Sequence, residues 1–313
     1  MAQGAPLPIE DLYGEHRRFL WSLCYRMLGS AADAEDVVQD TFMRALERPP
    51  RRLDEPLRPW LTRVALNLAR DLLRRRRRRE YTGPWLPSPI DTGDEASPPS
   101  HEPTIDGVRT LEGRYDLLES VSFAFLLALE ALTPTQRAVL LLCDVFDYSV
   151  KETADALDLS DANVKTTHHR ARHAMRTYEG RRTIPTTSAQ EAARTALGEF
   201  MRRLQQRDVA GIEALLAEDV RTMTDGGGEF RAALRAIVGR DKVARFYLAV
   251  AETAPHVSVR ARLLNGMPAM VVDVHSPIER QSPRFTFSLA LNRDGNISEI
   301  YVVSATHKLT AVK

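Results

Sequence analysis

Apolar and polar residues alternate at helical spacing through the first part of the chain. Residues 12–28 predict one amphipathic helix, which the Gly-Ser pair at 29–30 should end. A second helix is expected over residues 33–46, because its acidic start suits the positive end of a helix dipole. The four prolines of residues 49–59 predict a loop. A third amphipathic helix is expected over residues 60–78.

The pattern changes twice more along the chain. Residues 81–115 lose periodicity and are rich in Pro, Ser, Gly and acids, which indicates a linker. Helical spacing resumes near residue 117 and continues to about residue 178, with a break at residues 180–188. The first two thirds of the chain are therefore expected to be all helix.

The last third is expected to be α+β with an antiparallel sheet. Residues 189–217 have helical spacing. Asn265-Gly266 and Asp294-Gly295 are typical hairpin turns. Four runs alternate at strand spacing, at residues 257–264, 269–275, 285–291 and 297–303.

Composition alone describes an ordinary globular chain of two or three domains. Its 313 residues carry a net charge of +1, with 27% charged and 43% hydrophobic residues. Charge is uneven, however: residues 58–79 hold nine Arg against one acid, and residues 91–119 hold eight acids against two Arg. The apolar runs are shorter than the roughly 18 to 20 residues that span a bilayer. No signal peptide is visible, so a cytoplasmic protein without a membrane partner is expected.

The two cysteines predict neither a disulfide nor a metal site. Cys24 and Cys143 are far apart, each within an apolar helical pattern, and no CxxC is present. Two reduced, buried thiols are expected, and neither a metal nor another cofactor is predicted.

Residues 150–178 are the clearest candidate for nucleic-acid chemistry. A short helix over 150–157, a tight connection and a longer helix after the favourable N-cap Ser160 have the geometry that fits a DNA major groove. Six Lys or Arg oppose two acids between residues 160 and 182. A solvated helical hairpin with a charged surface is the alternative.

Six consecutive arginines, 74–79, close the third predicted helix. Such a run exceeds what a helix dipole requires, and phosphate contacts would explain it. Trp60, Arg63, Asn67 and Arg70 recur on the same helix. Spacing alone leaves open whether Trp60 belongs to a core or stacks on unpaired bases.

Four blocks in order carry a family resemblance, namely 33-DAEDVVQDTFMRAL-46, 60-WLTRVALNLARDLLRRRRR-78, 131-ALTPTQRAVLLL-142 and 152-ETADALDLSDANVKTTHHRAR-172. Over residues 10–178 the chain resembles a bacterial RNA polymerase sigma factor of the extracytoplasmic-function type. The resemblance implies a promoter-specificity subunit and not an enzyme, with core RNA polymerase (β′ and β subunits) and promoter DNA as partners. It implies sigma region 2 at 10–80, a linker at 81–116 and sigma region 4, a helix-turn-helix, at 117–180.

The resemblance also implies site residues in these two regions. Polymerase binding falls on Asp33, Glu35, Asp36, Gln39 and Asp40. The −10 element is assigned to the loop 49–59 and to Trp60, Arg63, Asn67, Arg70, Arg74 and Arg75. The −35 element is assigned to Ser160, Asn163, Lys165, Thr166, Thr167, His169, Arg170 and Arg172. One departure is His168, where the family usually has an inward-packed leucine.

The chain continues beyond the two sigma regions, and residues 188–313 resemble an NTF2/SnoaL-like cone. A subgroup of these sigma factors carries such an extension together with a W-L-P-x-P linker motif and a D-G-G-G motif. This chain has 85-WLPSP-89 and 225-DGGGEF-230, while 306-THKL-309 keeps only the Lys-Leu end of a third motif, Asn-Pro-Asp-Lys-Leu. The resemblance implies regulation in cis, without a separate anti-sigma factor, through a contact of Trp85, Leu86 and Pro87 with Asp225, Gly226, Gly227 and Gly228.

Three alternatives stay open. The acidic linker either threads through the RNA exit channel of the polymerase, as in the family, or is plain disordered chain. The cone could bind a small ligand or catalyse a reaction through Asp225, Asp273 or His275, although no third catalytic partner is identifiable. The helix-turn-helix could instead belong to a stand-alone transcriptional regulator, which the block at 33–46 argues against.

Overall fold

Two structural units make up the chain in the computed structural model, which describes residues 9–49, 56–76, 81–93, 115–182, 184–253 and 257–312. The first unit contains the described residues up to 76, together with 115–120 and 125–180. The second contains 81–93, 121–124 and the described residues from 181 onward. Residues 81–93, expected to be linker, therefore belong to the same unit as the C-terminal extension.

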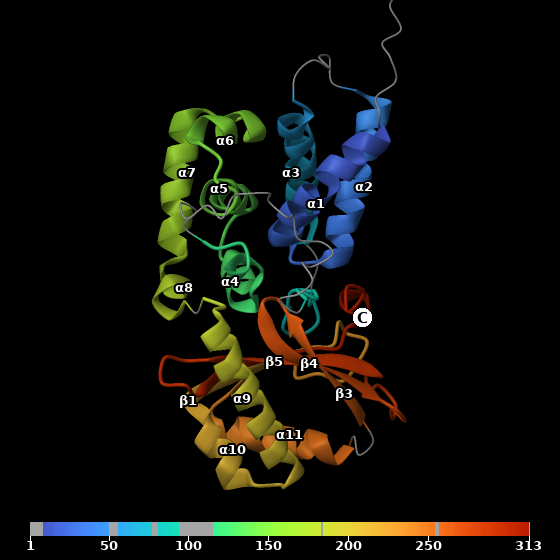
Figure 1. The fold of residues 1–313 in the computed structure, drawn as a ribbon, viewed down its shortest axis with the longest axis vertical. Coiled ribbons are helices and arrows are strands. Elements are labelled where there is room, and N and C mark those ends of the chain that lie inside the picture. The colour runs from blue at the N-terminus through green and yellow to red at the C-terminus, as the bar shows by residue number, and fades with distance from the viewer. Residues whose placement is uncertain are drawn as a thin grey trace, which may run out of the picture. The chain divides into compact units, whose positions relative to one another are not determined.

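Three helices begin the first unit (Figure 1): α1 (Ile9–Leu28), α2 (Ala31–Glu47) and α3 (Leu57–Arg76). The side chain of Ser30 caps α2 by accepting a hydrogen bond from the amide of Asp33. Their apolar faces pack together through Leu20, Val38 and Leu66, all buried. The periodicity of the sequence predicted these three helices.

Among the described residues, five more helices follow in the first unit: α4 (Phe123–Leu129), α5 (Pro134–Asp144), α6 (Val150–Leu157), α7 (Asp161–Ala174) and α8 (Arg176–Arg181). The first two residues of α4 belong to the second unit. A 3₁₀ turn, η1 (Glu119–Val121), precedes them. Thr133 and Ser149 form capping boxes at the starts of α5 and α6. Asp158 ends α6 with a left-handed backbone (φ 55°), and Ser160 caps α7. This turn chemistry creates the predicted helix-turn-helix.

Two buried arginines join the helices on either side of the linker within the first unit. Arg26, on α1, donates from Nε to Ser120 Oγ (2.7 Å) and from Nη2 to the Leu117 carbonyl (2.9 Å). Arg137, on α5, donates to the carbonyl of Met27 at 2.7 Å. Guanidinium groups suit this place because their several donors can satisfy the carbonyl oxygens at helix ends.

The second unit packs helices on a six-stranded sheet (Figure 1). Its helices are α9 (Thr187–Gln205), α10 (Val209–Leu215) and α11 (Arg240–Thr253), with a 3₁₀ turn, η2 (Thr306–Lys308), near the C-terminus. Its strands are β1 (Leu216–Asp225), β2 (Ile237–Val238), β3 (Val257–Leu264), β4 (Met267–Val274), β5 (Arg284–Leu291) and β6 (Ile297–Val303). The strand order is β2-β1-β6-β5-β4-β3.

The sheet is mixed, so the expected antiparallel pairing holds for the predicted strands but not for β1. The four predicted strands, β3 to β6, pair antiparallel in sequence order, but β1 joins parallel to β6. Strand β1 and helix α11 were not predicted, and the predicted helical segment 189–217 extends two residues beyond the end of α10 at Leu215. A register irregularity between Leu216 and Arg221 breaks the alternation of β1, which explains why its pattern was not recognised as a strand.

Aromatic side chains fill the space between the helices and the sheet. The rings of Phe200, Tyr247 and Phe287 lie 5.4 to 5.7 Å apart, centroid to centroid, and all three are buried. The Tyr247 hydroxyl pairs with the Thr222 hydroxyl, and burial raises the pKa of Tyr247. In the described part of the chain, no helix is both long and apolar enough to cross a membrane.

Phe200→Ala should destabilise the second unit by about 3–5 kcal/mol, because it leaves a cavity where the three rings meet. Val250→Ala, on the exposed side of α11, should change the free energy of unfolding by less than about 0.5 kcal/mol. Urea denaturation, together with hydrogen exchange of the amides in β4 to β6, measures both changes in the free energy of unfolding. Equal stability of the two variants would show that the aromatic cluster is not the core of this unit.

Candidate nucleic-acid interface and linker-binding site

The two faces of α7 differ sharply. Val164 and Ala171 on α7, and Met175 at its C-cap, are fully buried against the rest of the first unit. The predicted −35 residues that α7 exposes are Asn163, Lys165, Thr166, His169 and Arg170. A basic, polar outer face on the second helix of a helix-turn-helix is suited to the major groove.

Other predicted −35 residues have local structural partners. Ser160 accepts the hydrogen bond that caps α7, from the amide of Asn163. Thr167 is half-buried and donates to Asn163 Oδ1 at 3.1 Å, while Thr166 donates to the Ala162 carbonyl. The contact between Thr167 and Asn163 restrains the side-chain amide of Asn163 on the exposed face.

His168 and Arg172 point toward α5 and meet a buried carboxylate. His168 Nε2 lies 2.9 Å from Asp144 Oδ2, and Arg172 Nε donates to the same oxygen at 3.0 Å. The second Arg172 contact joins Nη2 to Asp144 Oδ1. Burial alone would raise the pKa of Asp144, but the contacts with His168 and Arg172 outweigh it and hold the pKa below its usual value.

The six individually predicted −10 residues, from Trp60 to Arg75, lie on α3. Asn67, Arg74 and Arg75 are exposed, and Trp60 is half-buried. Arg63 donates to the carbonyl of Asp155 on α6, and Arg70 donates to Thr135 Oγ1 on α5 at 3.0 Å. Two of the −10 candidates thus contact α5 and α6, the helices that pack against α7.

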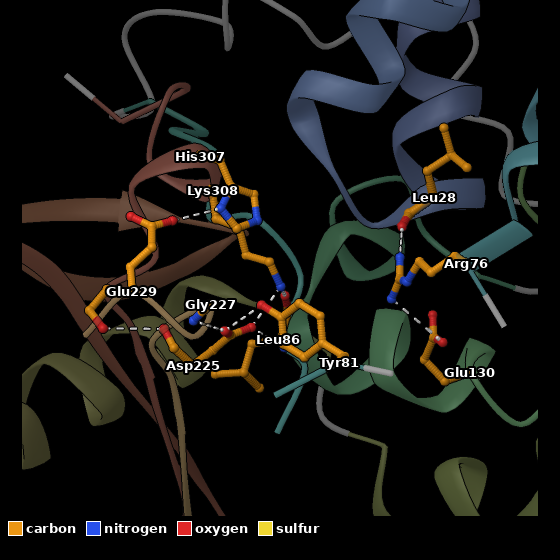
Figure 2. Close-up of polar contacts among 11 residues, drawn as sticks. Leu28, Arg76, Tyr81, Leu86, Glu130, Asp225, Gly227, Glu229, His307 and Lys308 are labelled. Carbon is orange, nitrogen blue, oxygen red and sulfur yellow. Dashed lines mark hydrogen bonds and ion pairs between the residues drawn. The ribbon is translucent and has the colours of Figure 1, made fainter. Parts of the chain in front are cut away.

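The structure describes the first three arginines of the run, Arg74 to Arg76. Arg74 pairs with Asp71 at 2.9 Å. Arg76 donates to the Leu28 carbonyl and pairs with Glu130 at 3.8 Å (Figure 2). Arg77 to Arg79, residues 50–55 of the predicted −10 loop and residues 94–114 of the acidic linker lie outside the described residues.

The predicted polymerase-binding residues share α2. Asp36, Gln39 and Asp40 are exposed, while Asp33 is partly covered in the first turn. Glu35 accepts two hydrogen bonds from Arg17, at 3.1 and 3.2 Å. Met43 and Leu46, 54% and 51% exposed on the same helix, were not predicted, although exposed apolar side chains beside acids suit a protein partner.

In the second unit the Asp225 carboxylate binds three separate segments (Figure 2). From residues 81–93 it accepts the Tyr81 hydroxyl (2.6 Å) and the Leu86 amide (2.7 Å). From its own loop it accepts the Gly227 amide (3.0 Å), and from the C-terminal segment it accepts Lys308 Nζ (2.6 Å). Asp225 and Lys308 are 1% and 2% exposed, so this is a buried ion pair.

Lys308 also holds the linker directly. Its ammonium donates to the Leu86 carbonyl at 2.6 Å and lies 4.6 Å from the Trp85 ring centroid and 4.8 Å from that of Tyr81. The role of 306-THKL-309 was left open by the motif comparison, and neither Tyr81 nor Lys308 was predicted as a site residue. The retained Lys-Leu end was the available indication.

The glycines after Asp225 allow this close approach. A Cβ on Gly226 would lie 2.7 Å from the Phe230 carbonyl oxygen. Gly227 has a φ of +61°, and a Cβ there would meet Ala305 at 2.8 Å. The D-G-G-G motif therefore brings the Gly227 amide to the carboxylate in a space that larger residues would fill.

A second contact anchors residues 90–92. Asn265 is buried and has a left-handed backbone, with a φ of 52°. Its side chain accepts the Ile90 amide at 3.0 Å and donates to the Val121 carbonyl at 2.7 Å. The predicted Asn265-Gly266 hairpin turn thus also holds both ends of the chain segment that leaves and re-enters this unit.

The residues of the catalytic alternative do not come together as a reactive group. Asp273 pairs with Arg284 at 2.5 Å and with Arg260 at 3.1 Å, and the Arg284 contact lowers its pKa. His275 is exposed, and Asp225 is occupied by the contacts above. No group of three or more metal-ligating side chains occurs among the residues that the structure describes.

Comparison with known proteins agrees with this architecture. Residues 12–79 match Sigma-70 region 2, and residues 122–175 match Sigma-70, region 4. The ECF RNA polymerase sigma factor SigJ of Mycobacterium tuberculosis is 33% identical over 238 residues, covering 75% of this chain and 71% of the relative. SigG of the same species is 38% identical over 179 residues, covering 52% and 46%.

The match in structure extends through the C-terminal domain. A crystal structure of the M. tuberculosis extracytoplasmic function sigma factor SigJ aligns with a TM-score of 0.73 at 27% identity, over 96% of this chain and 98% of that one. The predicted fold class is confirmed as far as two all-α sigma regions followed by a C-terminal α+β domain. Sigma-70 regions 2 and 4 on one chain define a transcription-initiation subunit. The chain belongs to the ECF RNA polymerase sigma factors.

Asp225→Asn should release residues 81–86 from the second unit, because it leaves the Lys308 ammonium buried without its counter-charge, at a cost of about 3–5 kcal/mol. Hydrogen exchange at Leu86 and proteolysis near Tyr81 should both accelerate. Asp294→Asn, the same substitution on an exposed turn, is the control. Unchanged protection at Leu86 in Asp225→Asn would show that Lys308 and the backbone hold the linker without this carboxylate.

Proposed function

We propose that this sigma factor reads a −35 element with α7 and a −10 element with α3, and that its extension regulates it in cis by holding residues 81–93. The observation that carries the regulatory part is the Asp225 carboxylate, which binds linker, loop and C-terminal segment at once. Such a contact couples the path of the linker to the folded state of the extension.

The exposed face of α7 supports the −35 assignment. Lys165 and Arg170 can bind phosphates or bases, and Asn163 has a side-chain amide suited to adenine. Arg74 and Arg75, exposed at the end of α3, suit phosphate contacts, which position a protein without selecting sequence. The predicted role of Thr167 is weaker, because it is half-buried and bonded to Asn163.

The contacts of Arg63 and Arg70 with α6 and α5 imply that the −10 face is partly occupied in this conformation. Promoter opening would therefore require α3 to exchange these contacts for nucleic acid. We infer that this is a resting form and that binding to core polymerase, through the acidic and apolar residues of α2, stabilises an open form.

The extension is better suited to regulation than to catalysis. Phe200, Tyr247 and Phe287 fill the interior between the helices and the sheet, and Asp273 is paired with two arginines. Regulation by the attached domain would make a separate anti-sigma factor unnecessary. We also propose a cytoplasmic location, since core polymerase and promoter DNA are there.

In vitro transcription with core polymerase and genomic promoter fragments tests the proposal. Wild-type chain should initiate from specific fragments, and Asp225→Asn combined with Lys308→Met should change run-off yield by several fold, because the linker is released without leaving a buried charge. Asp294→Asn should match wild type. Point variants are cleaner than truncation after Gly180, which would also expose Val121 and Phe123, buried in the second unit.

Three outcomes separate the parts of this proposal. If the double variant gave the same run-off yield as wild type, the linker contact would have no regulatory role under those conditions. If truncation after Gly180 also matched wild type, the extension would be a passive appendage. Binding to duplex DNA without any initiation would favour a stand-alone regulator and contradict the assignment of α3 and α7 to promoter elements.

A further inference from the structure

The end of α5 contacts both helices of the helix-turn-helix through two consecutive residues. Cys143 Sγ lies 3.4 Å from Thr153 Oγ1 on α6, and Asp144 binds His168 and Arg172 on α7. Asp144 is 1% exposed, although it ends a helix, where the dipole disfavours a negative charge. A carboxylate in such a place is retained only with cationic or donor partners, and α7 supplies them.

The partners on α7 are one helical turn apart. His168 and Arg172 are at positions i and i+4, so they lie on the same side of the helix. His168 continues the buried stripe formed by Val164, Ala171 and Met175, with 17% of its side chain exposed. Arg172 lies at the edge of that stripe with 40% exposed. Because His168 and Arg172 both contact the Asp144 carboxylate, rotation of α7 about its own axis would break these contacts together.

We propose that Asp144 is a positioning residue for promoter recognition: it fixes the rotation of α7 through His168 and Arg172, and so determines which side chains face the −35 bases. Arg172 then acts on recognition through Asp144, and Arg170 is the arginine that binds phosphate. The inference deepens, and rests on, the proposed −35 role of α7.

Two properties that a DNA contact normally changes together should therefore separate: the salt dependence of binding and the discrimination between right and wrong bases. Removing a phosphate contact lowers the salt dependence of binding by about 0.9 in the slope of log K against log salt. Removing a positioning contact leaves that slope unchanged but weakens discrimination between right and wrong bases, since the reading face is no longer held in register. The exposure of Arg172 would also permit a phosphate contact, and the slope distinguishes the two roles.

The experiment uses holoenzyme and a genomic promoter duplex that supports run-off transcription, compared with a copy whose −35 element is scrambled. Affinity for both is measured at several salt concentrations for wild type, Arg170→Gln and Arg172→Gln. These two variants remove the same charge from the same helix two residues apart. Arg170→Gln should lower the salt slope by about one. Arg172→Gln should keep the wild-type slope and lose at least about fivefold in discrimination.

Variants of the other two residues complete the test. Asp144→Asn should reproduce the loss of discrimination, and combining it with Arg172→Gln should add little, because both remove the same contact. His168→Gln keeps a side-chain N–H donor and should retain more discrimination than His168→Leu, which fits the buried stripe but donates nothing. Arg172→Gln and both His168 variants involve partly exposed positions, so they test the proposal even if Asp144→Asn does not fold.

A salt slope lowered equally by Arg172→Gln and Arg170→Gln would overturn the proposal and make Arg172 a phosphate-binding residue. Unchanged discrimination with only a lower melting temperature would also overturn it, since the contact would then merely stabilise the fold. Failure of wild-type holoenzyme to prefer the intact −35 element would instead contradict the proposed function of α7.

Discussion

The buried pair of Asp225 and Lys308 is the interaction on which the organisation of the second unit depends. It joins three segments that are distant in sequence, and each remaining lone pair of the carboxylate is used by the linker or by the glycine loop. Burying two charges costs several kcal/mol each, so such a pair contributes little net stability. What it contributes is selectivity: only a segment that offers a backbone amide and carbonyl at the positions of Leu86 can complete it.

The first unit follows the same rule with arginine. Arg137 is buried where the end of α1 leaves a carbonyl oxygen to be satisfied, and Arg26 is buried against the turn that precedes η1. Asp144 is buried where α7 supplies His168 and Arg172. In each case a charged group occupies a place that apolar side chains could fill with less desolvation. These contacts fix the relative orientation of the helices, because charge-assisted hydrogen bonds specify orientation more narrowly than apolar packing does.

The sequence predicted the elements whose periodicity is regular and missed those where tertiary contacts override it. The helices of the first unit and strands β3 to β6 follow from spacing and turn chemistry. By contrast, β1 is interrupted by a register shift and pairs with β6 across 78 to 81 residues. The motif residues Trp85, Leu86 and Asp225 do lie together, but Lys308 could not be paired from spacing. Nor could Arg63 and Arg70 be placed against α6 and α5, because side-chain contacts between helices leave no local pattern.

The composition of the Asp225 site argues for release of the linker in a single step. If residues 81–86 leave, the Lys308 ammonium loses the Leu86 carbonyl and the rings of Tyr81 and Trp85 together, and the carboxylate loses two of its donors. Partial release would leave charged groups buried with unmet hydrogen bonds, which costs more than full exposure to water. Intermediate states are therefore disfavoured, and the contact has the bistable character that a regulatory switch needs.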